Sequence, residues 1–134
     1  MSTGRWGFSA GEWSGALDRL SRLLAETAAA RATVTYGDVA RVAFEGRVTA
    51  RSGALMEALG DVDRATEAQR GVMIASLVVR ADTGIPGDGY FAFASDELGR
   101  DVRAERRVFW EREVARVWDA YAPHRDADIR RDML

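Results

Sequence analysis

The hydrophobic period of this chain changes at Gly71, and that change restricts the folds that the sequence can form. Before Gly71 the large apolar residues recur at steps of three and four, the spacing of one face of an α-helix. After it, residues 72–80 are rich in β-branched side chains and residues 90–94 alternate large and small, as strands do. A chain of 134 residues can bury one core, so the sequence predicts a single α+β domain over residues 1–134.

Capping residues mark the start of the first predicted helix. Ser9 can accept from the free amides of a first turn, and Glu12 can reach back to the Ser9 amide. The apolar residues that follow at helical spacing are Trp13, Leu17, Leu20 and Leu24. The pattern predicts a helix of about four turns that ends near Ala29.

Two further helices are predicted before Gly71. Residues 34–36 are β-prone and lead directly into a helical pattern over residues 37–44. A third helix is expected to begin after Thr49 or Ser52 and to end at Gly71, because glycine suits the carboxyl end of a helix.

The segment after Gly71 is predicted to form a β-hairpin. Residues 82–89, between the two strand-like runs, hold three glycines and a proline, which favour turns. The predicted element order is helix, short strand, two helices and hairpin. This is the order of a winged helix, whose third helix can enter the major groove. We therefore expect a winged-helix core over residues 9–95, with the hairpin as its wing.

A carboxyl-terminal amphipathic helix is expected over residues 99–122, ended by Pro123. Its apolar stripe consists of Trp110, Val114, Val117, Trp118 and Tyr121. This stripe is expected to pack on the core or on the first helix, or to form a homodimer face if the core is closed without it. Residues 123–134, with the single histidine at His124, are expected to be a charged, frayed tail.

Three short motifs resemble the DNA-binding domain of the alkylguanine-DNA alkyltransferases and alkyltransferase-like proteins. They are residues 34–40 (VTYGDVA), residues 50–55 (ARSGAL), and residues 78–84 (VVRADTG) followed by Gly89 and Tyr90. The resemblance covers roughly residues 34–90 and implies a winged helix that flips a base out of the duplex. The hairpin over residues 77–91 also resembles one found in small uncharacterised bacterial proteins.

The resemblance implies roles for two residues and excludes one reaction. A tyrosine at the position of Tyr36 acts against the backbone of the target nucleotide, and an arginine at the position of Arg51 fills the gap left by the flipped base. Where the family has its Pro-Cys-His-Arg active site, residues 74–77 are Ile-Ala-Ser-Leu, and several extra residues precede them. Ala75 stands at the nucleophile's place, so alkyl transfer to cysteine is excluded.

Composition narrows the remaining chemistry. There is no cysteine and one histidine, so disulfides, thiolate nucleophiles and zinc knuckles are excluded, and we expect no enzyme and no cofactor. The chain has no lysine, which is typical of GC-rich bacterial or phage coding sequences. Residues 1–8 hold no apolar run, and residues 72–79 are far shorter than the ~20 residues that span a bilayer. A cytoplasmic protein without a membrane partner is expected.

Two functions stay open. The first is a non-enzymatic nucleic-acid-binding protein, alkyltransferase-like or regulatory, that binds DNA or another nucleic acid. Tyr36 and Arg51 would make the contact, and the supporting residues would be Arg47, Thr49, Ser52 and Arg80. The alternatives for these residues are a core tyrosine with its hydroxyl at the rim and a solvated loop.

The second function is a protein-interaction module, such as a phage- or defence-associated inhibitor or adaptor. Residues 57–98 hold three arginines against eight acidic residues, so this segment is strongly acidic. The acidic third helix and wing would then bind a basic protein partner.

Overall fold

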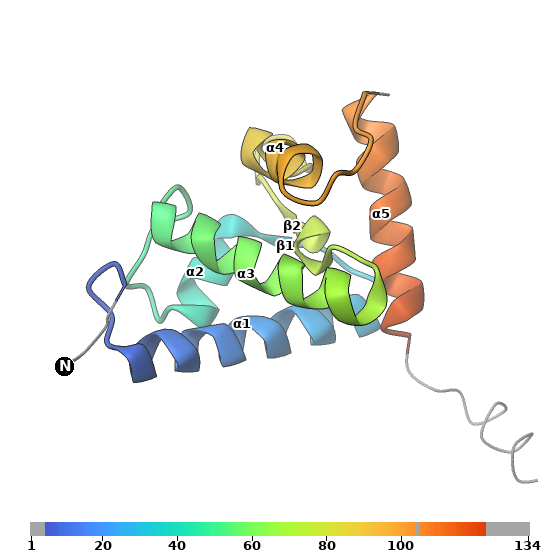
Figure 1. Ribbon diagram of the computed structural model, residues 1–134. Coiled ribbons are helices and arrows are strands. Elements are labelled where there is room, and N and C mark those ends of the chain that lie inside the picture. The colour runs from blue at the N-terminus through green and yellow to red at the C-terminus, as the bar shows by residue number, and fades with distance from the viewer. Residues whose placement is uncertain (1–4, 104, 123–134) are drawn as a thin grey trace, which may run out of the picture.

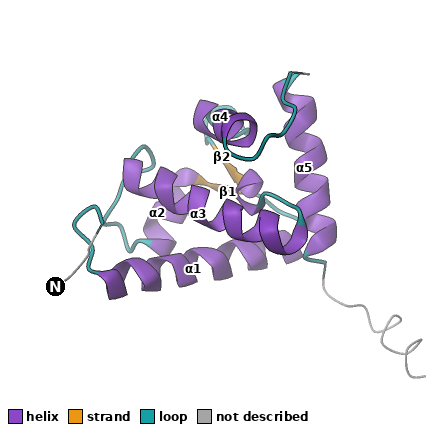
Figure 2. Ribbon diagram, viewed as in Figure 1, coloured by secondary structure: helices purple, strands orange, loops and turns teal. Residues whose placement is uncertain are grey.

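The computed structural model describes residues 5–103 and 105–122, and shows a mostly helical α+β chain with a small parallel sheet (Figures 1 and 2). Residues 123–134, including His124, lie outside the described part. In chain order, the elements are α1 (Ala10–Ala29), β1 (Val34–Thr35), α2 (Tyr36–Ala43), α3 (Gly53–Arg70), the 3-10 helix η1 (Ile74–Leu77), β2 (Val78–Val79), α4 (Asp88–Asp96) and α5 (Arg106–Ala120). No described helix combines the length and apolar character needed to cross a bilayer.

The predicted starts of α1 and α3 are confirmed, whereas the carboxyl-terminal helix, expected from residue 99, begins at Arg106. The Glu12 amide donates to Ser9 Oγ at 3.1 Å, and the Ser9 amide donates to Glu12 Oε1 at 2.7 Å, so the capping box is complete. At the start of α3 the Leu55 amide donates to Ser52 Oγ at 3.1 Å. Gly71 ends α3 in the left-handed conformation, with a φ of 71°, which glycine adopts without steric cost.

The predicted β-hairpin is wrong. Within the described residues, strand β1 pairs with β2 in parallel, Val34 opposite Val78 and Thr35 opposite Val79. The second predicted strand, residues 90–94, lies inside helix α4. The alternation of large and small residues suggested a strand, but Tyr90, Phe91 and Ala94 also share one face of a helix. All three are buried in α4.

The first predicted strand shrinks to two residues for a related reason. Every residue from 72 to 79 is buried, whereas a hairpin strand with one solvated face alternates. A continuous apolar run of this length fits a fully enclosed segment of either type. Here its middle folds as η1, which contacts α1, α3 and α5 (Figure 1).

The aromatic stripe of α5 belongs to the chain's own core. Trp110, Val114 and Val117 are buried, and Trp110 Nε1 donates to the Ser76 carbonyl at 2.7 Å. Trp118 Nε1 donates to the Ala32 carbonyl, just beyond α1, at 3.1 Å, and Tyr121 is partly buried. The stripe therefore packs on the core and beside the end of α1, which is the first of the two roles expected for it.

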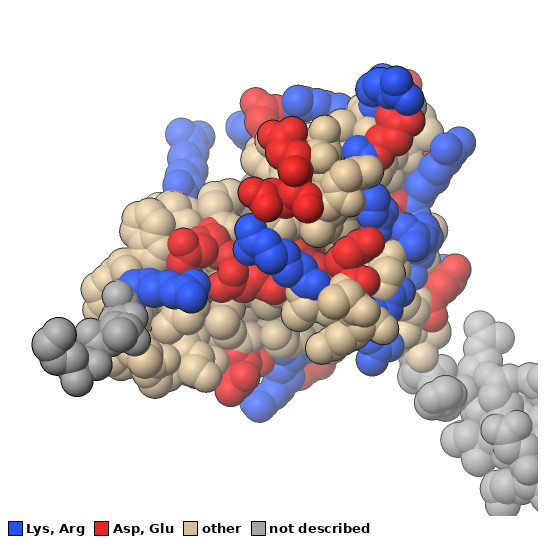
Figure 3. Space-filling view, viewed as in Figure 1, with Lys and Arg blue, Asp and Glu red and all other residues tan. Residues whose placement is uncertain are grey.

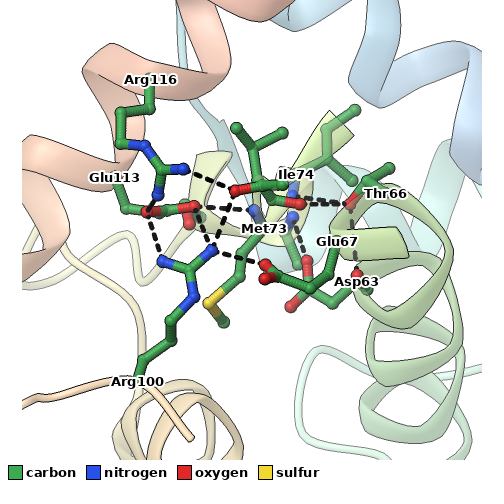
Figure 4. A network of polar contacts seen from close by, with 12 residues as sticks. Asp63, Thr66, Glu67, Met73, Ile74, Arg100, Glu113 and Arg116 are labelled. Carbon is green, nitrogen blue, oxygen red and sulfur yellow. Dashed lines mark hydrogen bonds and ion pairs between the residues drawn. The ribbon is translucent and has the colours of Figure 1, made fainter. Parts of the chain in front are cut away.

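Side chains from two helices hold the start of η1 (Figure 4). Three successive amides, of Met73, Ile74 and Ala75, donate to Glu113 Oε2 at 2.8 Å, Thr66 Oγ1 at 3.3 Å and Asp63 Oδ1 at 2.8 Å. The first turn of any helix leaves such amides without a backbone acceptor. We call this group of three acceptor side chains the amide clamp: Asp63, Thr66 and Glu113.

Two arginines neutralise the buried carboxylate of the clamp. Glu113 is 2% exposed, and its Oε1 accepts from Arg100 at 2.9 Å and from Arg116 at 2.7 Å. Both guanidinium groups also donate to the Gly71 carbonyl, and Arg100 pairs with Glu67. The segment between α3 and η1 is thus fixed by charge-assisted hydrogen bonds from three sides.

We expect Glu113→Ala to lower the free energy of unfolding by about 3 kcal/mol, because it leaves the buried Met73 amide without an acceptor and removes one of the two carboxylates that the partly buried Arg100 contacts. Glu111, on the same helix, makes an exposed pair with Arg107, so Glu111→Ala should cost about 0.5 kcal/mol or less. Urea denaturation of the two variants measures the difference. Equal losses would contradict the structural role assigned to Glu113.

Candidate functional site

A surface cleft of about 460 Å³ lies where α2, the loop before α3 and the segment after β2 meet. Its lining residues are Thr35, Tyr36, Gly37, Ala50, Arg51, Met56, Arg80, Ala81, Asp82, Gly87 and Gly89. The parallel pairing of β1 with β2 brings these distant segments together, because it sets the start of α2 beside the residues after Val79. Three of the predicted site residues, Tyr36, Arg51 and Arg80, therefore share one cleft.

Tyr36 is the first residue of α2 and is held at the wall of the cleft. Thr35 caps this helix by accepting from the Asp38 amide at 3.2 Å, which fixes the backbone at Tyr36. The Tyr36 hydroxyl accepts from the Gly87 amide at 3.1 Å. Burial raises the pKa of Tyr36, so the hydroxyl is protonated at neutral pH and still has a hydrogen to donate into the cleft.

Arg51 and Arg80 differ in how free their charges are. Within residues 5–103 and 105–122, the exposed Arg51 side chain has no ion pair and no hydrogen bond. Arg80 donates to both carboxylate oxygens of Asp82, at 2.9 and 2.8 Å, so a carboxylate of the same cleft already balances its charge. Arg51 is the cation of this cleft that is available to an incoming anion.

The other predicted contact residues do not line the cleft. Arg47 lies over the Phe8 ring, 3.9 Å from its centre, and pairs with Glu12 at 3.0 Å, so it closes the start of α1. The Thr49 carbonyl accepts from the Ser52 amide at 3.1 Å, and the Ser52 hydroxyl is used as the α3 cap. The predicted cluster is thus brought together only in part.

A smaller hollow of about 180 Å³ adjoins the cleft. It is lined by Tyr36, Met56, Leu59, Gly60, Asp63, Ala75, Gly89, Tyr90 and Phe93, of which Tyr36, Met56 and Gly89 also line the cleft. We call it the inner hollow. Ala75, the residue at the place of the resembled family's cysteine, lies in its wall.

Asp63 is the polar residue of the inner hollow that sequence reasoning missed. The acidic character of the third helix suggests a solvated residue at this position, but Asp63 is 3% exposed. The signal was its spacing, because Asp63 follows Leu59 by four residues and precedes Thr66 by three, on the buried face of α3. Burial, opposed by the hydrogen bond from the Ala75 amide, raises the pKa of Asp63 to about 8.

Tyr90 also lines the inner hollow, although it was not predicted as a site residue. Its hydroxyl and Ser76 Oγ form a hydrogen bond of 2.6 Å in which either group can donate. Burial raises the pKa of Tyr90, so its hydroxyl stays neutral. The hollow thus offers a mostly apolar wall with a carboxyl group and a phenol, which suits a flat, weakly polar ligand.

The acidic surface that motivated a protein partner is largely paired inside the chain. Glu57 and Asp61 pair with Arg5, Glu67 with Arg100, and Asp88 with Arg106. Figure 3 shows blue and red side chains interspersed over the face that carries α3 and α4. Among the described residues, no three His, Cys, Asp or Glu side chains are grouped to hold a metal ion.

The raised pKa of Asp63 predicts a stability that depends on pH. The folded state holds the Asp63 proton up to about pH 8, whereas the unfolded chain releases it near 3.8. The folded state therefore binds more protons between these values, and the free energy of unfolding falls as pH rises, by up to about 1.4 kcal/mol per pH unit.

Asp63→Asn should remove this contribution, because the amide oxygen still accepts from Ala75 and never ionises. Urea denaturation between pH 5 and pH 8 would show a flatter profile for Asp63→Asn than for the wild type. Asp61→Asn, on the exposed side of α3, is the matched control and should keep the wild-type slope. Parallel profiles for Asp63→Asn and the wild type would contradict the assignment.

The cleft and the inner hollow share three lining residues and extend from Arg51, which has no ion pair among the described residues, to the buried Asp63 carboxyl group. Compared with protein-family models, curated proteins and solved structures, the chain has no match.

Proposed function

We propose that this protein is a non-enzymatic nucleic-acid-binding protein of the alkyltransferase-like kind, with the cleft as its binding surface. The observation that carries the proposal is Arg51, which lies at the cleft beside Tyr36 and directly before the amino terminus of α3, with no ion pair or hydrogen bond in the part of the chain that the structure describes. The expected entry of α3 into the major groove belongs to this proposal, whereas the hairpin wing does not, because residues 90–94 fold within α4.

Electrostatics supports Arg51 as the principal contact. Phosphates supply most of the non-specific affinity for nucleic acid, and a guanidinium binds a phosphate through two parallel hydrogen bonds. Arg80 would first have to break its ion pair with Asp82. The free energy of breaking that pair offsets part of the free energy gained from a phosphate contact. Arg51 has no such competitor among the described residues, and the α3 dipole favours an anion at the same place.

The inner hollow supports a second element of the proposal. The resemblance to alkyltransferases implies a flipped base, and such a base needs a pocket that opens from the strand-binding surface. Tyr36, Met56 and Gly89 line both spaces, so a base could pass from the cleft into the hollow. With the Ala75 methyl group in the wall and no cysteine in the chain, the base would be held without alkyl transfer.

We expect the wild-type protein to bind a fluorescent DNA duplex in a salt-dependent way, and Arg51→Ala to weaken that binding. Loss of one phosphate contact should lower affinity several-fold at low salt and reduce the salt slope by about one. Arg51→Lys should restore part of the affinity because it restores the charge. Fluorescence anisotropy over a salt series measures both quantities.

Arg112 provides the matched control, since it is an exposed arginine outside the cleft with no ion pair or hydrogen bond in the described residues. Arg112→Ala should bind as the wild type does. The proposal fails if the wild type shows no salt-dependent binding, or if the Arg51 and Arg112 variants are indistinguishable.

A further inference from the structure

Trp6 is held in an unfavourable backbone conformation with most of its ring in solvent. Its φ is 55°, in the left-handed region that bulky residues rarely adopt. Its side chain is nevertheless not used as core, because Trp6 is 58% exposed, the most exposed of the large hydrophobic residues in the described chain. Strain of this kind persists only where the surrounding structure enforces it.

The surroundings of Trp6 enforce this position from both sides. The Phe8 amide donates to the Arg5 carbonyl at 2.8 Å and closes a tight turn with Trp6 at its tip. Arg5 is tied to α3 through Glu57 and Asp61, at 3.1 and 3.3 Å. On the other side, the Phe8 ring lies edge-on to Trp13 and Phe44 in the core.

Gly53, the first residue of α3, provides the seat for the Trp6 ring. A Cβ atom at position 53 would lie 2.6 Å from the ring, closer than real contacts allow. The Gly53 backbone has no positive φ, so alanine would otherwise be tolerated there. Glycine at position 53 therefore leaves room for the Trp6 ring and is not required by the helix backbone.

The seat of Trp6 adjoins the cleft. Gly53 follows Arg51 by two residues, so their Cα atoms are at most about 7 Å apart. Met56, three residues after Gly53 on the same helix face, lines the cleft and is itself 39% exposed. An apolar surface thus continues from the Trp6 ring through Met56 into the cleft.

We propose that Trp6 is a stacking platform for an unpaired base of the nucleic-acid strand whose phosphate Arg51 holds. This inference rests on the proposed function and adds a preference for single-stranded or locally opened nucleic acid. Every base offers a flat face to an exposed indole, so the contact tolerates any sequence. Arg5 offsets the charges of Glu57 and Asp61 beside the platform, which lowers the repulsion that a phosphate would meet there.

The experiment compares two single strands of equal length, one of thymidines and one of abasic deoxyribose phosphates, by fluorescence anisotropy. Trp6→Ala should bind the thymidine strand about tenfold more weakly than the wild type and the abasic strand equally well. Trp6→Phe should keep most of the affinity. Gly53→Ala should act in the same direction as Trp6→Ala, because it displaces the ring without removing it.

Val42→Ala, which shortens another exposed apolar side chain outside the cleft, is the matched control and should bind both strands as the wild type does. Thermal unfolding of each variant shows whether it is folded. If Trp6→Ala weakens both strands alike, Trp6 acts through the structure and the stacking role is overturned. If Arg51→Ala weakens binding and Trp6→Ala does not, the stacking role alone falls. If the wild type binds the DNA duplex but neither single strand, this inference falls alone, and if it binds none of the three, the proposed function falls with it.

Discussion

Three side-chain hydrogen bonds to successive amides, at Met73, Ile74 and Ala75, determine the arrangement of the remaining elements. Without those acceptors the start of η1 would bury three unpaired N–H groups, at a cost of roughly 1–3 kcal/mol each. The acceptors come from α3 and α5, so the same bonds dock both helices against the turn. Because η1 directly precedes β2, its position sets Val78 and Val79 beside β1. The pairing of the two strands then brings together the segments that line the cleft.

The exclusive use of arginine suits this construction. Arg100 makes four hydrogen bonds to two carboxylates and a backbone carbonyl, one more than the three N–H groups of a lysine ammonium could each supply. Most arginines of the described chain are similarly engaged, the exceptions being Arg22, Arg51 and Arg112. The net charge of −2 therefore says little about binding, since most charges are already matched and the position of an unmatched arginine is informative.

Elements with local signals could be predicted from the sequence. The capped starts of α1 and α3 and the glycine at the end of α3 depend on neighbours a few residues away, and all were found. The segment after Gly71 depends on acceptors up to 40 residues distant, above all Glu113, which no local pattern reveals. Of the residues that line the cleft, Tyr36, Arg51 and Arg80 were named from the motif resemblance, whereas Asp63 of the inner hollow was not predicted, because a charged side chain usually indicates an exposed position.

Helix α3 sets the spacing of everything that the proposed interface would touch. Gly53 seats Trp6, whereas Leu59 and Gly60 wall the inner hollow, and six to seven residues of helix separate them by about 10 Å. Stacked nucleotides rise by about 3.4 Å per strand, so that distance corresponds to about three of them. A base on Trp6 and a base in the inner hollow would together require an opened region of a few nucleotides, with Arg51 at a phosphate on the Trp6 side of the inner hollow.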